Sequence, residues 1–139
     1  MKNKKIFNIG LIGCGVVGLR RIENLPNSFK LIGCADPNVS LKKIFKKNKK
    51  LFLTSNWKKL LNLKNLDVVI VSTTHHLHTQ IISACIKKKL HVFVEKPGGI
   101  SAIKTKKIIS RLKKKKTNLI IRVGFNHRYH LAFLKAKEL

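Results

Sequence analysis

Three glycines near the N-terminus have the spacing of a phosphate-binding turn. Gly13, Gly15 and Gly18 follow a short apolar run and precede a segment with helical character. The first glycine permits a tight turn, the second lets the backbone approach a pyrophosphate, and the third lets the helix pack on a strand. The amides at such a helix N-terminus bind phosphate charge, so we expect the hexapeptide, with Val16 and Val17, to contact the pyrophosphate of a dinucleotide.

A carboxylate follows these glycines at the distance typical of dinucleotide binding. Asp36 comes eighteen residues after Gly18, at the end of a second predicted strand. There it can accept hydrogen bonds from the adenosine ribose hydroxyls. The two signals together favour dinucleotide binding over a merely structural turn. Asp36 would repel the 2′-phosphate of NADP and therefore favours NAD, but the surrounding lysines soften that preference and leave NADP possible.

Strand-like and helix-like segments alternate along the chain. Short apolar runs predict strands over residues 6–12, 29–35, 51–53, 68–71, 92–94 and 119–123. Helical spacing predicts helices over residues 19–25, 41–45, 57–63, 78–87 and 102–114. The run 68–71 is almost purely β-branched, which indicates burial on both faces of a parallel sheet. We therefore predict one α/β domain with a doubly wound, mostly parallel Rossmann-type sheet, whose ligand site lies beyond the carboxyl ends of the strands.

The composition is that of a globular chain with an unusual charge. The 139 residues suffice for one module, and 44% of them are hydrophobic, which excludes collagen-like, disordered and multi-span membrane proteins. Lys+Arg number 31 against 5 Asp+Glu, a net charge of +26. Such a charge raises affinity for any polyanion, so a nucleic-acid-binding protein is an alternative. No aromatic-rich basic strand or zinc spacing supports it, and we expect neither a specific nucleic-acid partner nor a membrane partner.

Three cysteines lie in apolar stretches without a Cys-x-x-Cys pair. An odd number of such residues, Cys14, Cys34 and Cys85, predicts buried thiols in a reducing cytoplasm. A lysine-rich start and an apolar run ending at Cys14 also resemble a bacterial lipoprotein signal, but such a signal does not need the glycines that follow. His75 and His76 have no metal-ligating residues at suitable spacing, so we predict no metal site.

Polar loops after three later strands resemble those of a known family. Thr73 and Thr74 follow one strand, Glu95-Lys96-Pro97 the next, and residues 124–128 the last. With His78, these loops resemble the N-terminal NAD(P)-binding domain of the Gfo/Idh/MocA oxidoreductases, from about residue 6 to the end of the chain. Glu-Lys-Pro at a strand end is the most specific element. The resemblance implies cofactor contacts from Ser72, Thr73, Thr74, His75, Glu95, Lys96 and Pro97.

The resemblance also implies a catalytic role for Lys96, beside the nicotinamide and the substrate hydroxyl. Moving a hydride from an alcohol carbon requires the hydroxyl proton to leave or the developing alkoxide to be stabilised by a cation. Lys96 can supply either, and Pro97 would fix the backbone that aims it. The alternative is that Glu95 and Lys96 form a solvated pair before a proline turn. His78 has no base to pair with in the sequence, so we expect a hydrogen-bonded structural histidine.

The chain departs from the family pattern in several places. Proline and asparagine are usual where Thr74 and His75 stand, and a larger apolar residue is usual after Pro97, so Gly98-Gly99 predicts a looser turn. The family's second domain supplies an aspartate/histidine acid-base pair, whereas here no aspartate follows Asp67.

The sequence thus predicts a dinucleotide-binding domain over residues 1–128, with 129–139 starting the connection to a missing C-terminal substrate domain. The resemblance implies an oxidoreductase that acts on a sugar, polyol or related hydroxyl or carbonyl compound. We expect the isolated chain to bind NAD, or NADP, with little or no turnover because nothing closes the site. The alternatives are a non-catalytic dinucleotide-binding or sensor module and the nucleic-acid-binding protein. Oligomeric state stays open.

Overall fold

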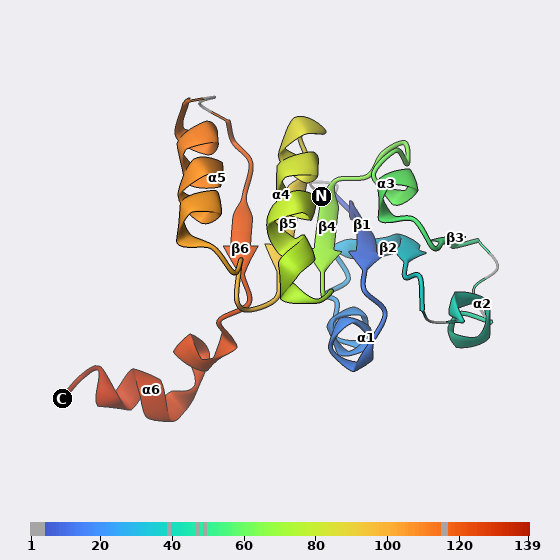
Figure 1. Ribbon diagram of the computed structural model, residues 1–139. Helices are drawn as coiled ribbons and strands as arrows, with labels where there is room; N and C mark the ends of the chain where they lie inside the picture. Colours follow the sequence, from blue (N-terminus) through green and yellow to red (C-terminus); the bar gives the residue numbers. More distant parts are fainter. Residues whose placement is uncertain (1–4, 39, 47, 49, 115–116) are drawn as a thin grey trace.

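The computed structural model describes residues 5–38, 40–46, 48, 50–114 and 117–139. Strands and helices alternate as the sequence predicts (Figure 1). Their bounds in chain order are β1 Phe7–Ile12, α1 Val16–Glu23, β2 Phe29–Ala35, α2 Leu41–Ile44, β3 Phe52–Thr54, α3 Trp57–Leu60, β4 Val68–Val71, α4 His75–Lys87, β5 His91–Val94, α5 Ala102–Lys114, β6 Ile121–Val123, the 3-10 turn η1 Asn126–Tyr129 and α6 Leu131–Ala136.

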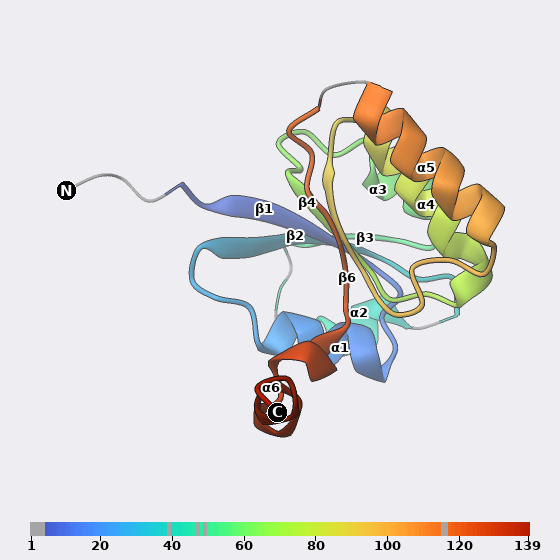
Figure 2. The ribbon, with the colours of Figure 1, turned by 90° about the vertical axis from the view of Figure 1, so that its left-hand side faces the viewer.

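The six strands form one parallel sheet in the order β3-β2-β1-β4-β5-β6. The chain runs outward from β1 through β2 to β3, then crosses back to β4 and continues the other way. Figure 2 shows α4 and α5 against one side of the sheet and α1 on the opposite side. This confirms the predicted doubly wound α/β fold. The order reverses between β1 and β4, where folds of this kind bind their ligands.

Strand β4 divides its side chains between two apolar cores. Val69 and Val71 pack into the larger core with residues of α4 and β5, whereas Ile70 packs into the second core. Successive side chains of a strand point to opposite faces, so a strand buried on both sides needs no polar alternation. This explains the β-branched run that the sequence displays at β4.

The entry to β4 is held by Asp67. Its Oδ2 accepts a hydrogen bond from the backbone N–H of Asn8 at 2.8 Å. Its own backbone N–H donates to the carbonyl oxygen of Asn8 at 3.0 Å. One aspartate therefore fixes the start of β4 against β1.

Two helices begin earlier than the sequence predicts. Helix α1 starts at Val16, inside the glycine hexapeptide, because the turn is complete once the chain passes the extended Gly15. Helix α4 starts at His75, because Thr74 has an extended backbone and serves as the N-cap residue. Helix α3 ends at Leu60, so the predicted helix over 57–63 is longer than the real one.

The three cysteines are free and buried, as predicted. Residues from Phe125 onward are exposed, and Figure 1 shows α6 extending away from the sheet. Within the described part of the chain, no helix is both long and apolar enough to span a membrane.

Candidate functional site

The turn after β1 is packed directly against the backbone that follows β4. Gly13 has φ +91°, a conformation that favours glycine, and its N–H donates to the carbonyl oxygen of Ala35 at 2.9 Å. A Cβ on Gly13 would lie 2.5 Å from the carbonyl oxygen of Ser72. Gly13 thus brings the first turn and the β4 loop into contact.

The other two glycines of the hexapeptide have opposite surroundings. A Cβ on Gly18 would lie 2.1 Å from the carbonyl oxygen of Gly13, so α1 packs closely against the turn only because this residue lacks a side chain. A Cβ on Gly15 would meet no atom within 4 Å. Val16 and Val17, in the first turn of α1, are exposed. The backbone at Gly15 is therefore open to a ligand.

Asp36 lies at the end of β2 and contacts the glycine turn. Its Oδ2 accepts a hydrogen bond from the backbone N–H of Cys14 at 2.7 Å, and its Oδ1 accepts one from the N–H of Asn38 at 2.9 Å. The carboxylate, predicted to serve the ribose, thus also orders the turn beside it.

The loop after β4 contains a hydroxyl without a partner. The Oγ of Ser72 is buried and makes no hydrogen bond in the described structure. Thr73 is half-buried, while Thr74 and His75 are exposed. A buried hydroxyl without a partner is costly. A polar ligand group at this loop would satisfy it.

The Glu95-Lys96-Pro97 segment follows β5, and its glutamate is paired with α1. Oε1 of Glu95 lies 2.5 Å from Nε of Arg21, and the Glu95 side chain is only 12% exposed. The Arg21 guanidinium also lies over the ring of Phe93, 5.2 Å from its centroid. The alternative of a solvated pair between Glu95 and Lys96 therefore does not describe this loop.

Lys96 and Pro97 are exposed, and Lys96 lines a cavity of about 490 Å³. Val17 of α1 and Asn126 after β6 line the same cavity. Residues predicted from three separate loops are thereby brought together at the carboxyl ends of the strands.

The two glycines after Pro97 make a close-packed turn. A Cβ on Gly98 would lie 2.8 Å from Cγ2 of Val123, and one on Gly99 would lie 2.7 Å from Cγ2 of Thr79. The expected looser turn is therefore wrong: the missing side chains let this loop approach β6 and α4.

His78 is fully buried in α4 and is hydrogen-bonded at both ring nitrogens. Nδ1 lies 2.8 Å from the carbonyl oxygen of Pro97, and Nε2 lies 2.9 Å from that of Thr73. It is the hydrogen-bonded structural histidine that the sequence predicts.

Arg21 is the residue of this region that the sequence analysis missed. It lies three residues after Gly18 and so on the same face of α1, which packs toward the sheet. The only available signal was its position on α1, since Glu95 is 74 residues away.

Two of the buried cysteines have raised pKa values. A hydrogen bond with the Cys14 side chain, together with burial, raises the pKa of the Cys34 thiol. Burial raises the pKa of Cys85 to about 12. Among the described residues no cluster of histidine, cysteine, aspartate or glutamate could hold a metal ion.

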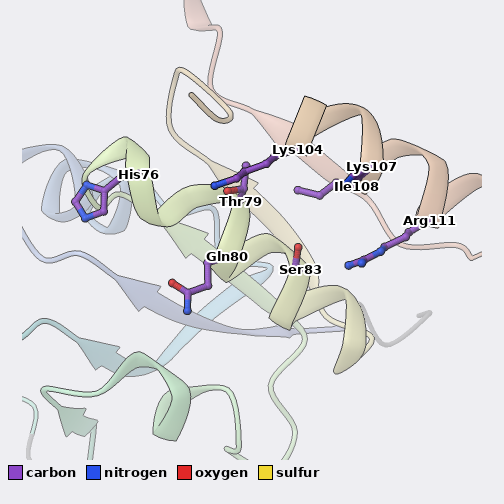
Figure 3. Close-up of a pocket in the computed structure, with 8 residues that line it drawn as sticks. All are labelled: His76, Thr79, Gln80, Ser83, Lys104, Lys107, Ile108 and Arg111. Carbon is purple, nitrogen blue, oxygen red and sulfur yellow. The ribbon is translucent and has the colours of Figure 1, made fainter. Parts of the chain in front are cut away.

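A second cavity lies between α4 and α5, apart from the predicted site. Figure 3 shows Thr79 and Ser83 on the side of α4 that faces α5, which contributes Lys104, Lys107 and Arg111 to the lining. None of the site residues predicted from the sequence lines it. Its lining is basic and carries no carboxylate.

Comparisons with known proteins agree on one family. Residues 7–125 match the family model GFO_IDH_MocA, described as "Oxidoreductase family, NAD-binding Rossmann fold". The chain is 32% identical over 135 residues to a myo-inositol 2-dehydrogenase from Thermotoga maritima, covering 95% of this chain and 40% of that protein. It is 27% identical to the uncharacterized oxidoreductase YrbE of Bacillus subtilis, covering 94% and 38%.

Solved structures show the same fold. A scyllo-inositol dehydrogenase from Lactobacillus casei, with bound NAD(H) and scyllo-inositol, superposes with a TM-score of 0.83 at 23% identity, over 97% of this chain and 41% of that one. An NAD-binding oxidoreductase from Klebsiella pneumoniae superposes with a TM-score of 0.75 at 26% identity, over 96% and 38%. The chain spans about 40% of the length of the relatives it matches.

Proposed function

The chain belongs to the Gfo/Idh/MocA oxidoreductase family and forms its NAD-binding Rossmann domain, and we propose that it holds the cofactor for hydride exchange with a sugar or polyol. The proposal is supported by the open backbone at Gly15, the Asp36 carboxylate and Lys96, which follow β1, β2 and β5 and so lie at the same edge of the parallel sheet.

The residues present fit a nicotinamide dinucleotide. The amides around Gly15 and the first turn of α1 would hold the pyrophosphate, and Asp36 would accept from the ribose hydroxyls. Ser72 Oγ, which is buried without a partner, would gain one from the cofactor. Val16, Val17, Thr73, Thr74 and His75 would flank it. When bound, the nicotinamide ring accepts or donates the hydride.

Lys96 is the catalytic residue in this proposal. Its side chain is exposed toward a cavity, and the Glu95 carboxylate beside it is engaged by Arg21 rather than by Lys96. The Lys96 amine would accept the substrate hydroxyl proton, or its ammonium form would stabilise the alkoxide that develops.

The substrate class comes from the relatives. The Thermotoga maritima protein is a myo-inositol 2-dehydrogenase. By analogy we propose that the enzyme to which this chain contributes its cofactor domain acts on a sugar or polyol. Residues 1–128 would form the cofactor domain and 129–139 the start of a connection to a substrate domain. The exposed apolar side chains of Leu131 and Phe133 in α6 support that connection.

We infer that the 139-residue chain alone binds NAD with little or no turnover. Its sequence has no aspartate after Asp67 to serve as an acid-base partner. Titration calorimetry with NAD and NADP tests the binding, with NAD expected to bind more tightly. No heat with either ligand at millimolar concentration would refute the proposal.

A mixing experiment distinguishes the hypothesis of an enzyme from that of a non-catalytic sensor module. The chain is mixed with the substrate domain of a relative, with NAD and with a panel of polyols. Reduction of NAD in the mixture would exclude the sensor. Cofactor binding without any reduction would favour it.

A further inference from the structure

His78 lies outside the proposed cofactor contacts. Among the described residues it is the only buried residue that is polar or charged, with 0% of its surface exposed. It lies in the first turn of α4, in which His75 and His76 are exposed. A buried imidazole must find partners for its ring nitrogens.

Both of its partners are backbone carbonyl oxygens. Nδ1 lies 2.8 Å from the oxygen of Pro97, and Nε2 lies 2.9 Å from that of Thr73. Both distances are within hydrogen-bond range, so the buried ring fills the space between the two carbonyl oxygens and contacts each of them.

The two oxygens belong to the two loops that matter most for the proposed site. Thr73 lies in the loop after β4, next to Ser72 and Thr74. Pro97 follows Lys96 directly in the loop after β5. On the other side of Lys96, Glu95 is held by Arg21 of α1. Lys96 therefore lies between two anchored residues, one tied to α1 and the other to α4.

We propose that His78 is a positioning residue whose ring joins the Lys96 loop to the cofactor-flanking loop and holds the two loops in register. This inference rests on the proposed function, since it concerns where Lys96 lies relative to that site. His78 itself is buried and touches no reacting atom.

Nuclear magnetic resonance of the 139-residue chain tests the contact of the ring with the two loops. We expect the ring N–H of His78 to be protected from exchange with solvent. A ring N–H that exchanges as fast as that of the exposed His127 would overturn the proposal.

Two substitutions each keep one of the bonds. The side-chain amide nitrogen of His78→Asn lies near the position of Nδ1 and can still donate to Pro97. That of His78→Gln lies near Nε2 and can still donate to Thr73. We expect the Lys96 and Gly98 amide signals to shift more in His78→Gln, and those of Thr73 to shift more in His78→Asn.

The proposal would be contradicted if both variants shifted the amide signals of both loops equally, or if neither variant shifted them. If a variant does not fold, the ring-proton measurement on the unaltered chain decides. Each folded variant is expected to bind NAD about tenfold more weakly, the effect of one lost hydrogen bond. The control His76→Gln, on the same helix but exposed, should bind NAD unchanged.

The outcomes keep the two proposals apart. An unaltered chain that binds no NAD refutes the proposed function, whatever the ring protons show. An unaltered chain that binds NAD but exchanges the ring proton of His78 as fast as that of His127 refutes only the positioning role.

Discussion

The carboxylate of Asp36 and the backbone N–H of Cys14 lie 2.7 Å apart, so the acidic residue at the end of β2 directly orders the glycine turn after β1. The two features that suggested dinucleotide binding from the sequence are therefore one physical unit. A charged acceptor shortens and strengthens such a bond, and its loss affects the turn as well as any ligand.

This pairing predicts distinct effects for two substitutions of Asp36. Asp36→Ala removes both the acceptor for Cys14 and the proposed ribose contact, and we expect NAD binding to weaken by about 1.5–3 kcal/mol. Asp36→Asn keeps a neutral acceptor and should lose less. The preference for NAD over NADP should fall in both, since the negative charge is gone. Calorimetry with both cofactors measures this, and an unchanged cofactor preference would count against Asp36 as the ribose ligand.

Alanine substitutions at Gly15 and Gly18 should affect different properties, NAD affinity at Gly15 and the free energy of unfolding at Gly18. A Cβ at Gly15 meets no atom, so Gly15→Ala is expected to change the free energy of unfolding by less than about 0.5 kcal/mol while weakening NAD binding at least tenfold. A Cβ at Gly18 collides with the Gly13 carbonyl, so Gly18→Ala should lose about 1–3 kcal/mol of stability. Urea unfolding and calorimetry give both quantities. A stable Gly15→Ala chain with full NAD affinity would remove the pyrophosphate from this turn.

The Arg21–Glu95 pair should contribute measurably to stability. The carboxylate is 12% exposed and the guanidinium about a third exposed, so Arg21→Gln leaves a largely buried charge without its cationic partner. We expect a loss of about 1–3 kcal/mol in the free energy of unfolding, as for hydrogen bonds to charged groups. The neighbouring exposed Arg20 provides the control, and Arg20→Gln should stay within about 0.5 kcal/mol. Equal stabilities of the two variants would show that the pair contributes little.

The raised pKa of Cys85 predicts that the free energy of unfolding falls at alkaline pH. Burial raises its pKa from 9.0 to about 12 in the folded chain. Below pH 9 the thiol is neutral in both states and its burial stabilises the fold fully. As the pH rises from 9 toward 12, the unfolded chain ionises first, so this contribution is lost. The stability of Cys85→Ala should fall less steeply over that range. Parallel slopes for the two proteins would contradict the prediction.

The basic groove between α4 and α5 tests the polyanion alternative. With Lys104, Lys107 and Arg111 along one wall, we expect binding of single-stranded DNA at 50 mM salt and its weakening by about twentyfold at 200 mM. Replacing all three by glutamine should weaken the low-salt binding and leave NAD affinity unchanged. Fluorescence anisotropy measures the salt slope. Tight binding that persists at 200 mM salt would revive a nucleic-acid function.

Much of the fold was accessible from the sequence because its signals are local. The β-branched run of β4 and the glycine spacing depend on neighbours in the chain, and both predicted the observed elements. Asp36 was found for the same reason, since its distance from Gly18 is a feature of the βαβ unit.

The remaining features depend on which loops meet in space. Arg21 and Glu95 are 74 residues apart, and His78 joins Thr73 to Pro97 only because β4 and β5 are neighbours. Gly98 and Gly99 look permissive in the sequence, yet Val123 and Thr79 occupy the space that larger residues would need. Side-chain contacts of this kind have no local pattern.

The four side chains of β4 are all β-branched and similar in size, and they pack into two cores. Packing alone therefore distinguishes only weakly between one register of β4 against β1 and another. A slip by one residue would exchange Val69 and Val71 with Ile70 at little cost in volume. Asp67, bonded on both sides to Asn8, removes that ambiguity. Mutational tolerance should therefore be high within β4 and low at the polar residue before it. The loop that carries Ser72 takes its alignment from Asp67 and from its own bond, in which the Ser72 N–H donates to the carbonyl oxygen of Ile12 at 2.8 Å.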